Sequence, residues 1–142
     1  MLRRKGLKVL ALAAVFTATG CRRASDDRVK VVKETVAAFV GAVAVNDTSV
    51  IRRLAWTDSI AKKYVAIAAA EQGRWRPYAA ARLNPTRDSF FKADTALVYF
   101  ATEPKRLACI DVPGPNSGVS AQLLHQNGSW RVLWLQLEPV IC

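Results

Sequence analysis

The chain has 142 residues, of which 51% are apolar and 23% are charged. This length suits one domain better than two, and the composition excludes an intrinsically disordered chain. The net charge is +10, but four of the 21 basic residues lie within the first eight positions, so residues 21–142 carry 17 basic against 11 acidic side chains, or +6. This excess favours anionic surfaces such as phospholipid head groups and does not indicate nucleic acid.

The first twenty residues have the layout of a secretory signal. A basic start at residues 1–8 is followed by the apolar run Val9–Ala18 and then by small residues. The run is far shorter than the roughly 20 residues with which a helix spans a bilayer. A short apolar run behind a basic start is typical of a signal peptide. The alternative interpretation is a buried N-terminal core helix.

Ala18-Thr19-Gly20-Cys21 resembles the lipobox of bacterial lipoproteins, in which small residues precede a cysteine that receives diacylglycerol before cleavage. The resemblance implies a signal peptide at 1–20, palmitate-type acylation of Cys21, and a membrane-anchored protein of the cell envelope. The outer membrane is favoured for a Gram-negative source, because Arg22 is not the aspartate that retains lipoproteins at the inner membrane. Two or three acyl chains hold a protein durably, at about 0.8 kcal/mol per buried methylene.

The export route has two candidates. Residues 3–8 (RRKGLK) resemble a twin-arginine signal, but Gly6 stands where a bulky apolar residue is usual. General secretion is therefore the expected route. Residues 21–25 would form a short tether between the anchored cysteine and the folded domain at 26–142.

Two cysteines remain once Cys21 is assigned to the anchor. In an exported domain, Cys109 and Cys142 predict a disulfide, whose 34-residue loop would contribute about 3.8 kcal/mol in the chain-entropy model. Two buried free thiols are the alternative. No cofactor is expected, and a metal site is disfavoured because one histidine and two spare cysteines would need a carboxylate at an unmarked position to complete a closed zinc site.

The first half of the domain reads as helices. Asp26–Val45 is a strong helix candidate, because apolar residues recur at three- and four-residue spacing. Residues 46–48 (NDT) break this helix and can cap a second one at Ser49–Ala55, while Thr57-Asp58 can cap a third at Ser59–Gln72. The following Gly73–Thr86 is the least regular stretch. The apolar stripe of the first helix comprises Val29, Val32, Val36, Phe39, Val40 and Val43.

The second half reads as strands, with candidates at 96–102, 107–112, 119–126 and 129–137. Asn127-Gly128 predicts a type I′ hairpin turn between the last two. A two-residue loop places His125 opposite Trp130, Leu123 opposite Val132 and Ala121 opposite Trp134. The last strand is apolar on both faces, so we expect it to be central in the sheet or covered twice.

Helices followed by antiparallel strands predict an α+β fold. The polar break and short helix in AVNDTSVIRRLAW, with hairpins closing on NGSWRVLWLQL, resemble the nuclear-transport-factor-2-like (NTF2-like, cystatin-like cone) superfamily. The resemblance implies N-terminal helices packed on a curved antiparallel sheet in a cone-like arrangement. That superfamily includes isomerases and dehydratases as well as non-catalytic binding domains, so it leaves the function open.

His125, Asp94 and Asp111 are the candidates for catalysis. Cone-fold enzymes often use a histidine, aspartate or tyrosine inside the pocket for proton transfer. His125 is the only histidine, and the two aspartates flank predicted strands. The alternative interpretation is structural: His125 would pair across the hairpin with Trp130, and the aspartates would form turns.

Residues 74–78 (RWRPY) interleave guanidinium groups with aromatic rings. Such a segment can bind anions by stacking and pairing, or it can be a surface connection whose arginine stems cover the core. The anion-binding candidates are Arg74, Trp75, Arg76, Tyr78, Arg82 and Arg87.

The sequence therefore predicts an exported lipoprotein, anchored to the lipid bilayer through acylated Cys21, with a non-catalytic domain. That domain would bind an envelope protein or a small ligand, and not nucleic acid. The alternative is a cone-fold enzyme of the isomerase, dehydratase or hydrolase type acting on a small apolar substrate. The common catalytic signatures are absent from the sequence.

Overall fold

A computed structural model describes residues 16–86, 89–103 and 117–138, with side chains from Asp27 onward. The chain divides into two compact units, 1–30 and 31–142. The predicted strand at 107–112 lies outside the described residues. The elements are α1 (Phe16–Val45), α2 (Thr48–Leu54), α3 (Asp58–Ala80), β1 (Arg82–Pro85), β2 (Phe90–Phe91), β3 (Thr95–Glu103), β4 (Gly118–Gln126) and β5 (Ser129–Glu138).

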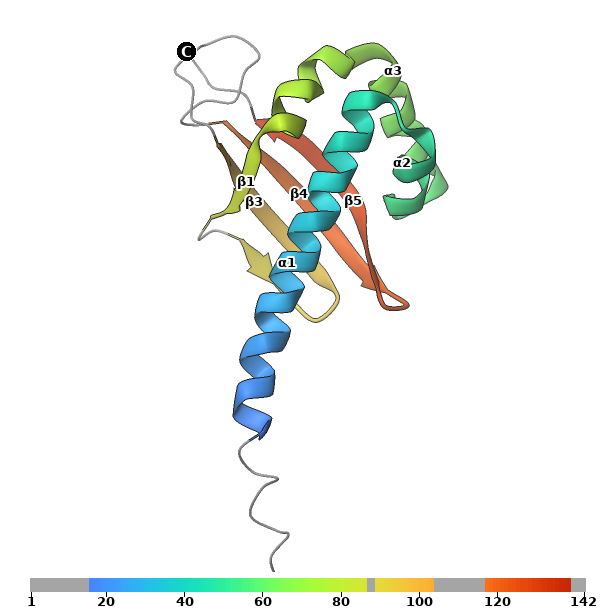
Figure 1. Cartoon of the computed structure of the whole chain (residues 1–142). Coiled ribbons are helices and arrows are strands. Elements are labelled where there is room, and N and C mark those ends of the chain that lie inside the picture. The colour runs from blue at the N-terminus through green and yellow to red at the C-terminus, as the bar shows by residue number, and fades with distance from the viewer. Residues whose placement is uncertain (1–15, 87–88, 104–116, 139–142) are drawn as a thin grey trace, which may run out of the picture. The chain divides into compact units, whose positions relative to one another are not determined.

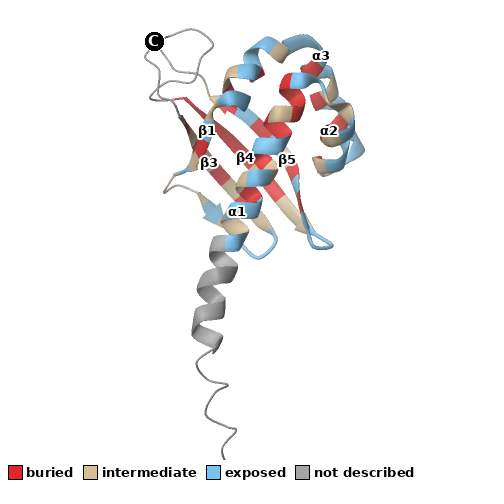
Figure 2. Ribbon diagram, viewed as in Figure 1, coloured by how far each residue is buried: buried red, intermediate tan, exposed pale blue. Residues whose placement is uncertain are grey.

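The second unit has the predicted α+β class. Its strands form an antiparallel sheet in the order β1-β3-β4-β5, and β2 pairs with β3 beside that path. The helices pack on one face of this open sheet (Figure 1), an arrangement consistent with a cone-like fold. Figure 2 shows that the buried residues gather where the helices meet the sheet. From Val32 to Val43 the predicted apolar stripe of α1 is confirmed, since each of its residues is at most 1% exposed.

The helix starts follow the predicted caps for α2 and α3. The Asp47 carboxylate accepts hydrogen bonds from the Ser49 hydroxyl at 2.8 Å and the Val50 N–H at 3.2 Å. These bonds hold the pKa of the Asp47 carboxyl below its usual value. The Thr57 hydroxyl accepts from the Ile60 N–H at 3.3 Å. Both caps therefore satisfy N–H groups that a helix start leaves unpaired.

Two helix boundaries were predicted wrongly. Helix α1 begins at Phe16 rather than at Asp26, so the expected tether at 21–25 lies within the helix. The helix can extend through this stretch because it contains no proline. Helix α3 kinks at Glu71, where φ is −130° and ψ is 23°, but it resumes and runs to Ala80 through the stretch expected to be irregular. Trp75 and Tyr78, three residues apart on one helix face, are both buried, so core packing favours helix here despite the internal proline.

The hairpin register agrees with the prediction only near the turn. His125 pairs with Trp130 and Leu123 with Val132, as expected. Ala121 pairs with Leu135 and not with Trp134, because the register shifts by one residue between Gln122 and Leu123. The extra residue falls in β5 and makes a β-bulge.

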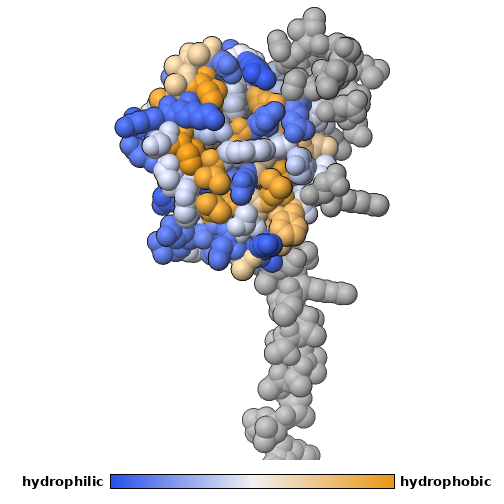
Figure 3. Space-filling view, turned by 180° about the vertical axis from the view of Figure 1, so that it is seen from behind, coloured by the Kyte–Doolittle hydropathy of each residue, from blue (hydrophilic) through white to orange (hydrophobic). Residues whose placement is uncertain are grey.

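The bulge explains why large apolar residues occupy both even-numbered and odd-numbered positions of β5. Trp130 and Val132 before the bulge, and Leu135 and Leu137 after it, are all buried. The strand is therefore not central or covered on both faces, as its sequence had suggested; it is the last strand in the sheet order. Trp134 is instead 38% exposed. In the view from behind, apolar side chains lie between polar ones (Figure 3).

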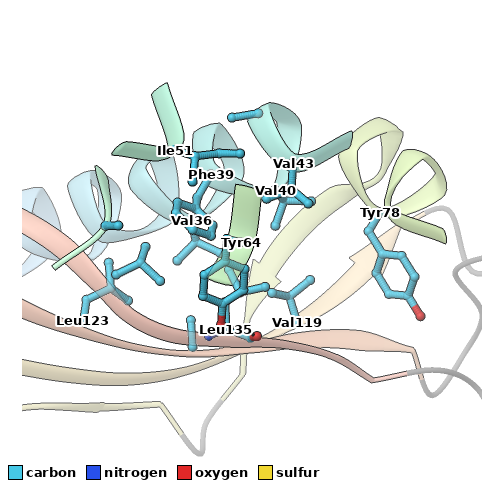
Figure 4. Close-up of a cluster of buried hydrophobic side chains, with 14 of the residues drawn as sticks. Val36, Phe39, Val40, Val43, Ile51, Tyr64, Tyr78, Val119, Leu123 and Leu135 are labelled. Carbon is cyan, nitrogen blue, oxygen red and sulfur yellow. Dashed lines mark hydrogen bonds between the residues drawn. The ribbon is translucent and has the colours of Figure 1, made fainter. Parts of the chain in front are cut away.

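The outer edge of β5 is closed by the segment Ala55–Tyr78. The Trp56 N–H donates to the Val132 carbonyl at 2.8 Å, beside a parallel bridge from Ala55 to Val132. The Tyr64 hydroxyl donates to the Leu135 carbonyl at 2.8 Å and accepts from the Leu135 N–H at 2.6 Å. Figure 4 shows Tyr64 reaching from the helices to Leu135. The Tyr78 hydroxyl donates to the Glu138 carbonyl at 3.3 Å. These contacts satisfy backbone groups that an edge strand would otherwise expose.

The Tyr64 ring is fixed by aromatic packing. It stands edge-on to Phe39, with ring centroids 4.9 Å apart, and to Trp75 at 6.3 Å. Burial raises the pKa of the Tyr64 phenol above its usual value of 10.0, and the hydrogen bond with Leu135 partly offsets that effect. The hydroxyl is therefore neutral at physiological pH, which allows it to donate and accept at once.

Tyr64→Phe removes this hydroxyl and leaves the N–H and C=O of Leu135 without their partner. We expect a loss of about 2–6 kcal/mol in the free energy of unfolding, measured by urea denaturation, because each of the two unsatisfied buried groups costs about 1–3 kcal/mol. Tyr99→Phe is the matched control: Tyr99 is half-buried and its hydroxyl bonds to no described residue, so it should change stability by about 0.5 kcal/mol or less. Equal losses in the two variants would contradict the assignment.

Candidate functional site

A hollow of about 260 Å³ lies between α3 and β5. Successive turns of α3 contribute one wall, and the strand after the bulge contributes the other. The bulge is what turns Trp134 outward while Leu135 stays in the core. The lining residues are Lys63, Tyr64, Ile67, Trp134, Leu135 and Gln136.

The chemistry of this hollow suits binding better than proton transfer. Lys63 is exposed, and its Nζ lies 5.7 Å from the centroid of the Tyr64 ring. Gln136 is exposed as well and supplies an amide. The Tyr64 hydroxyl is bonded to Leu135 and is not available to a ligand. A cation, an amide and an indole can hold a polar or anionic group, but none of them is a general base at neutral pH.

His125 forms the predicted cross-strand pair. Its ring lies 4.9 Å from the Trp130 ring, centroid to centroid, at an interplanar angle of 46°. Its backbone N–H donates to the Asp94 carbonyl at 2.9 Å, while the Asp94 side chain is exposed. Among the described residues, no side chain hydrogen-bonds to the His125 ring. The structure brings His125 and Asp94 together through the backbone only, which makes no acid–base pair.

The arginine-rich segment does not form one surface. Trp75 and Tyr78 are 4% and 3% exposed and belong to the core, whereas Arg74, Arg76 and Arg82 are exposed. Arg74 pairs with Glu71 at 3.7 Å, and Arg76 donates to the Gln72 side chain at 3.4 Å. Of the two interpretations of this segment, the structure gives no support to a ligand stacked on these rings, because helix periodicity turns the rings inward and the guanidinium groups outward.

Cys109, Asp111, Cys142 and Arg87 lie outside the described residues. Cys21 lies within α1, in the first unit, and its side chain is not described. The expected disulfide and the expected acylation remain predictions.

The buried polar groups of the second unit serve the fold. The Thr102 hydroxyl contacts both the carbonyl and the hydroxyl of Ser117, and the Ser120 hydroxyl donates to the Glu138 carboxylate. Within the described ranges, the buried side-chain atoms without a hydrogen-bond partner are Trp75 Nε1 and Thr86 Oγ1. An indole N–H and a hydroxyl supply neither a base nor an activated nucleophile on their own.

Over residues 16–86, 89–103 and 117–138, no group of three or more His, Cys, Asp or Glu side chains could hold a metal ion. Within the same ranges, none of the helices has the length and hydropathy needed to span a membrane. Comparison of the chain with protein-family models, with curated proteins and with solved structures finds no match.

Sequence reasoning found the His125–Trp130 pair but missed the hollow. Tyr64 and Leu135 are 71 positions apart, and Trp134 faces outward only because of the bulge. One signal was present: Tyr64 lies in the apolar stripe of its helix, and a buried tyrosine needs a partner for its hydroxyl. That signal indicates a bond but does not identify the acceptor.

His125→Ala tests the structural interpretation of the histidine. Because the ring contacts Trp130 and has no described polar partner, we expect a loss of about 1 kcal/mol or less in the free energy of unfolding, measured by urea denaturation. Trp130→Ala, which removes a ring that is only 7% exposed, should cost about 3–5 kcal/mol. A His125→Ala loss as large as that of Trp130→Ala would show that the histidine has a larger structural role.

Proposed function

We propose that this chain is an exported lipoprotein, anchored to the bacterial cell envelope through acylated Cys21, whose NTF2-like α+β domain is a non-catalytic binding module. The observation that supports a non-catalytic domain is its filled interior. In a cone-fold enzyme the space between helices and sheet holds the substrate. Here that space is occupied by packed side chains such as Phe39, Val40, Val119 and Leu123, each at most 1% exposed (Figure 4).

The hydrogen bonds inside the domain support the same proposal. Tyr64 and Tyr78 donate to backbone carbonyls of β5, which leaves neither phenol free to exchange protons with a ligand. A catalytic acid or base needs a ligand within hydrogen-bond reach, and in the described interior these hydroxyls face the backbone. Binding is therefore proposed at the outer surface of the domain, where the hollow beside Trp134 lies.

The anchor rests on the sequence around Cys21. The lipobox-like residues 18–21 follow a basic start and a short apolar run, which together are the requirements for export and acylation. Acylation supplies the membrane affinity that an exported domain lacks, at about 0.8 kcal/mol per buried methylene. The predicted disulfide between Cys109 and Cys142 fits an oxidising compartment outside the cytoplasm.

Cys21→Ser tests the anchor. The wild-type protein, extracted from the membranes of an expressing bacterium, should partition into the detergent phase of a phase-separating detergent, and Cys21→Ser should stay in the aqueous phase. Cys109→Ser is the matched control, because it also removes a thiol but leaves the anchor intact, and it should partition like the wild type. An intact mass showing cleaved protein without acyl chains would contradict the proposal.

A further inference from the structure

One row of side chains crosses the sheet from β2 to β5. Phe90 lies opposite Leu97, Leu97 opposite Gln122, and Gln122 opposite Trp134. Residues directly opposite each other in antiparallel strands point to the same face. With strands about 4.8 Å apart, this outer row is about 14 Å long.

The outer row lies on the face turned away from the helices. The chain neighbours of its members, such as Ala96, Leu123 and Leu135, are buried on the helix side, and successive strand residues point to opposite faces. Phe90 is 50% exposed and Trp134 is 38% exposed, while Leu97 is half-buried between them. The view from behind shows apolar side chains gathered between polar ones (Figure 3). A soluble domain that holds two large aromatic rings in water at both ends of such a row has a surface suited to a partner.

Cations lie beside the exposed aromatic rings. The Lys92 Nζ is 5.7 Å from the centroid of the Phe90 ring. Lys63 lines the hollow together with Trp134. Arg131, exposed on the same face of the sheet, lies opposite Leu124. Among the described residues neither Lys63 nor Arg131 forms an ion pair with a carboxylate, and both side chains are exposed.

Two of the described carboxylates lie near the outer row, and neither forms an ion pair with Lys63 or Arg131. The Glu138 carboxylate accepts a hydrogen bond from Ser120, and Asp94 is exposed beside the start of β3. Lys63, Lys92 and Arg131 outnumber these carboxylates by one, so the surface around the outer row has a small excess of positive charge, of the same sign as the net charge of +6 over residues 21–142. Its partner should carry negative charge.

Aromatic rings flanked by lysine and arginine match the surface of an anionic bilayer. Aromatic side chains favour the head-group level of a membrane, and basic residues favour the phosphates above it. A second copy of this chain fits less well, because packing two copies through this face would bring together two surfaces that each carry an excess of positive charge.

We propose that the outer row Phe90–Leu97–Gln122–Trp134, with Lys63, Lys92 and Arg131, docks this domain on a phospholipid bilayer that contains anionic lipids. The inference rests on the proposed lipid anchor, which holds the domain at the bilayer. The contact is reversible and weakens with salt, because exposed charges are screened over about 10 Å at 0.1 M ionic strength.

Tryptophan fluorescence tests this docking. Of the four tryptophans, Trp75 and Trp130 are buried, Trp56 is half-buried and Trp134 is exposed. The acylated protein is placed in vesicles of phosphatidylcholine, or of phosphatidylcholine and phosphatidylglycerol in equal parts, with brominated acyl chains as quencher. Quenching should be stronger in the vesicles with phosphatidylglycerol, and Trp134→Phe should abolish most of that increment.

A matched pair of lysine variants tests the charge. Lys63→Gln should shift the docking equilibrium by about fivefold away from the membrane, as expected for one basic residue near an anionic surface. Lys62→Gln removes the same charge from the neighbouring position, but Lys62 pairs with Asp58 at 3.3 Å and does not line the hollow, so it should have little effect. Circular dichroism checks that both variants are folded.

Several outcomes would overturn the proposal. Equal quenching in the two vesicle types would do so, and so would extra quenching by phosphatidylglycerol vesicles that persists in Trp134→Phe. Equal effects of the two lysine variants, or a cross-linked dimer that depends on Trp134, would also contradict it. The anchor is tested separately by the intact mass of the same preparation. If that mass shows no acyl chains, the anchor fails, and docking is then measured by the same quenching on protein bound from solution.

Discussion

The hydrogen bonds between the Tyr64 hydroxyl and the backbone of Leu135 are the interaction on which the second unit depends. β5 is an edge strand rich in apolar residues, and an unprotected edge of this kind invites pairing with other chains. One phenol satisfies both polar groups of Leu135, while Trp56 and Tyr78 bond to carbonyls on either side of it. The helices therefore cover the face of the sheet and also close its edge.

The β-bulge in β5 connects this edge to the outer surface. By shifting the register it keeps Leu135 and Leu137 in the core and turns Trp134 outward. Trp134 lines the hollow and ends the outer row. The bulge that brings Leu135 within hydrogen-bond distance of Tyr64 therefore also exposes the aromatic ring proposed for docking. The filled interior and the aromatic outer face with its flanking cations are the features on which the proposed binding role at a membrane rests.

The sequence predicted features that local chemistry determines. The caps at Asp47 and Thr57, the buried stripe of α1 and the hairpin turn at Asn127-Gly128 follow from residue types within a few positions. The bulge could not be predicted, because within the apolar run of β5 either register places a large apolar side chain on the core face. The register that forms is the one in which Val132 bridges Ala55 and Leu135 bonds to Tyr64, and both of these partners are far away in the chain. The candidate site was missed for the same reason, since its two walls come from α3 and β5.

Hydrogen exchange of the Leu135 amide tests the central claim most directly, because this N–H donates to the Tyr64 hydroxyl instead of to another strand. In the wild-type protein the amide should exchange as slowly as the amides of the central strand β4. In Tyr64→Phe it should exchange at least about tenfold faster than the change in global stability explains, while β4 amides follow global stability. Fast exchange of Leu135 in the wild type, or equal acceleration of Leu135 and β4 in the variant, would contradict the account.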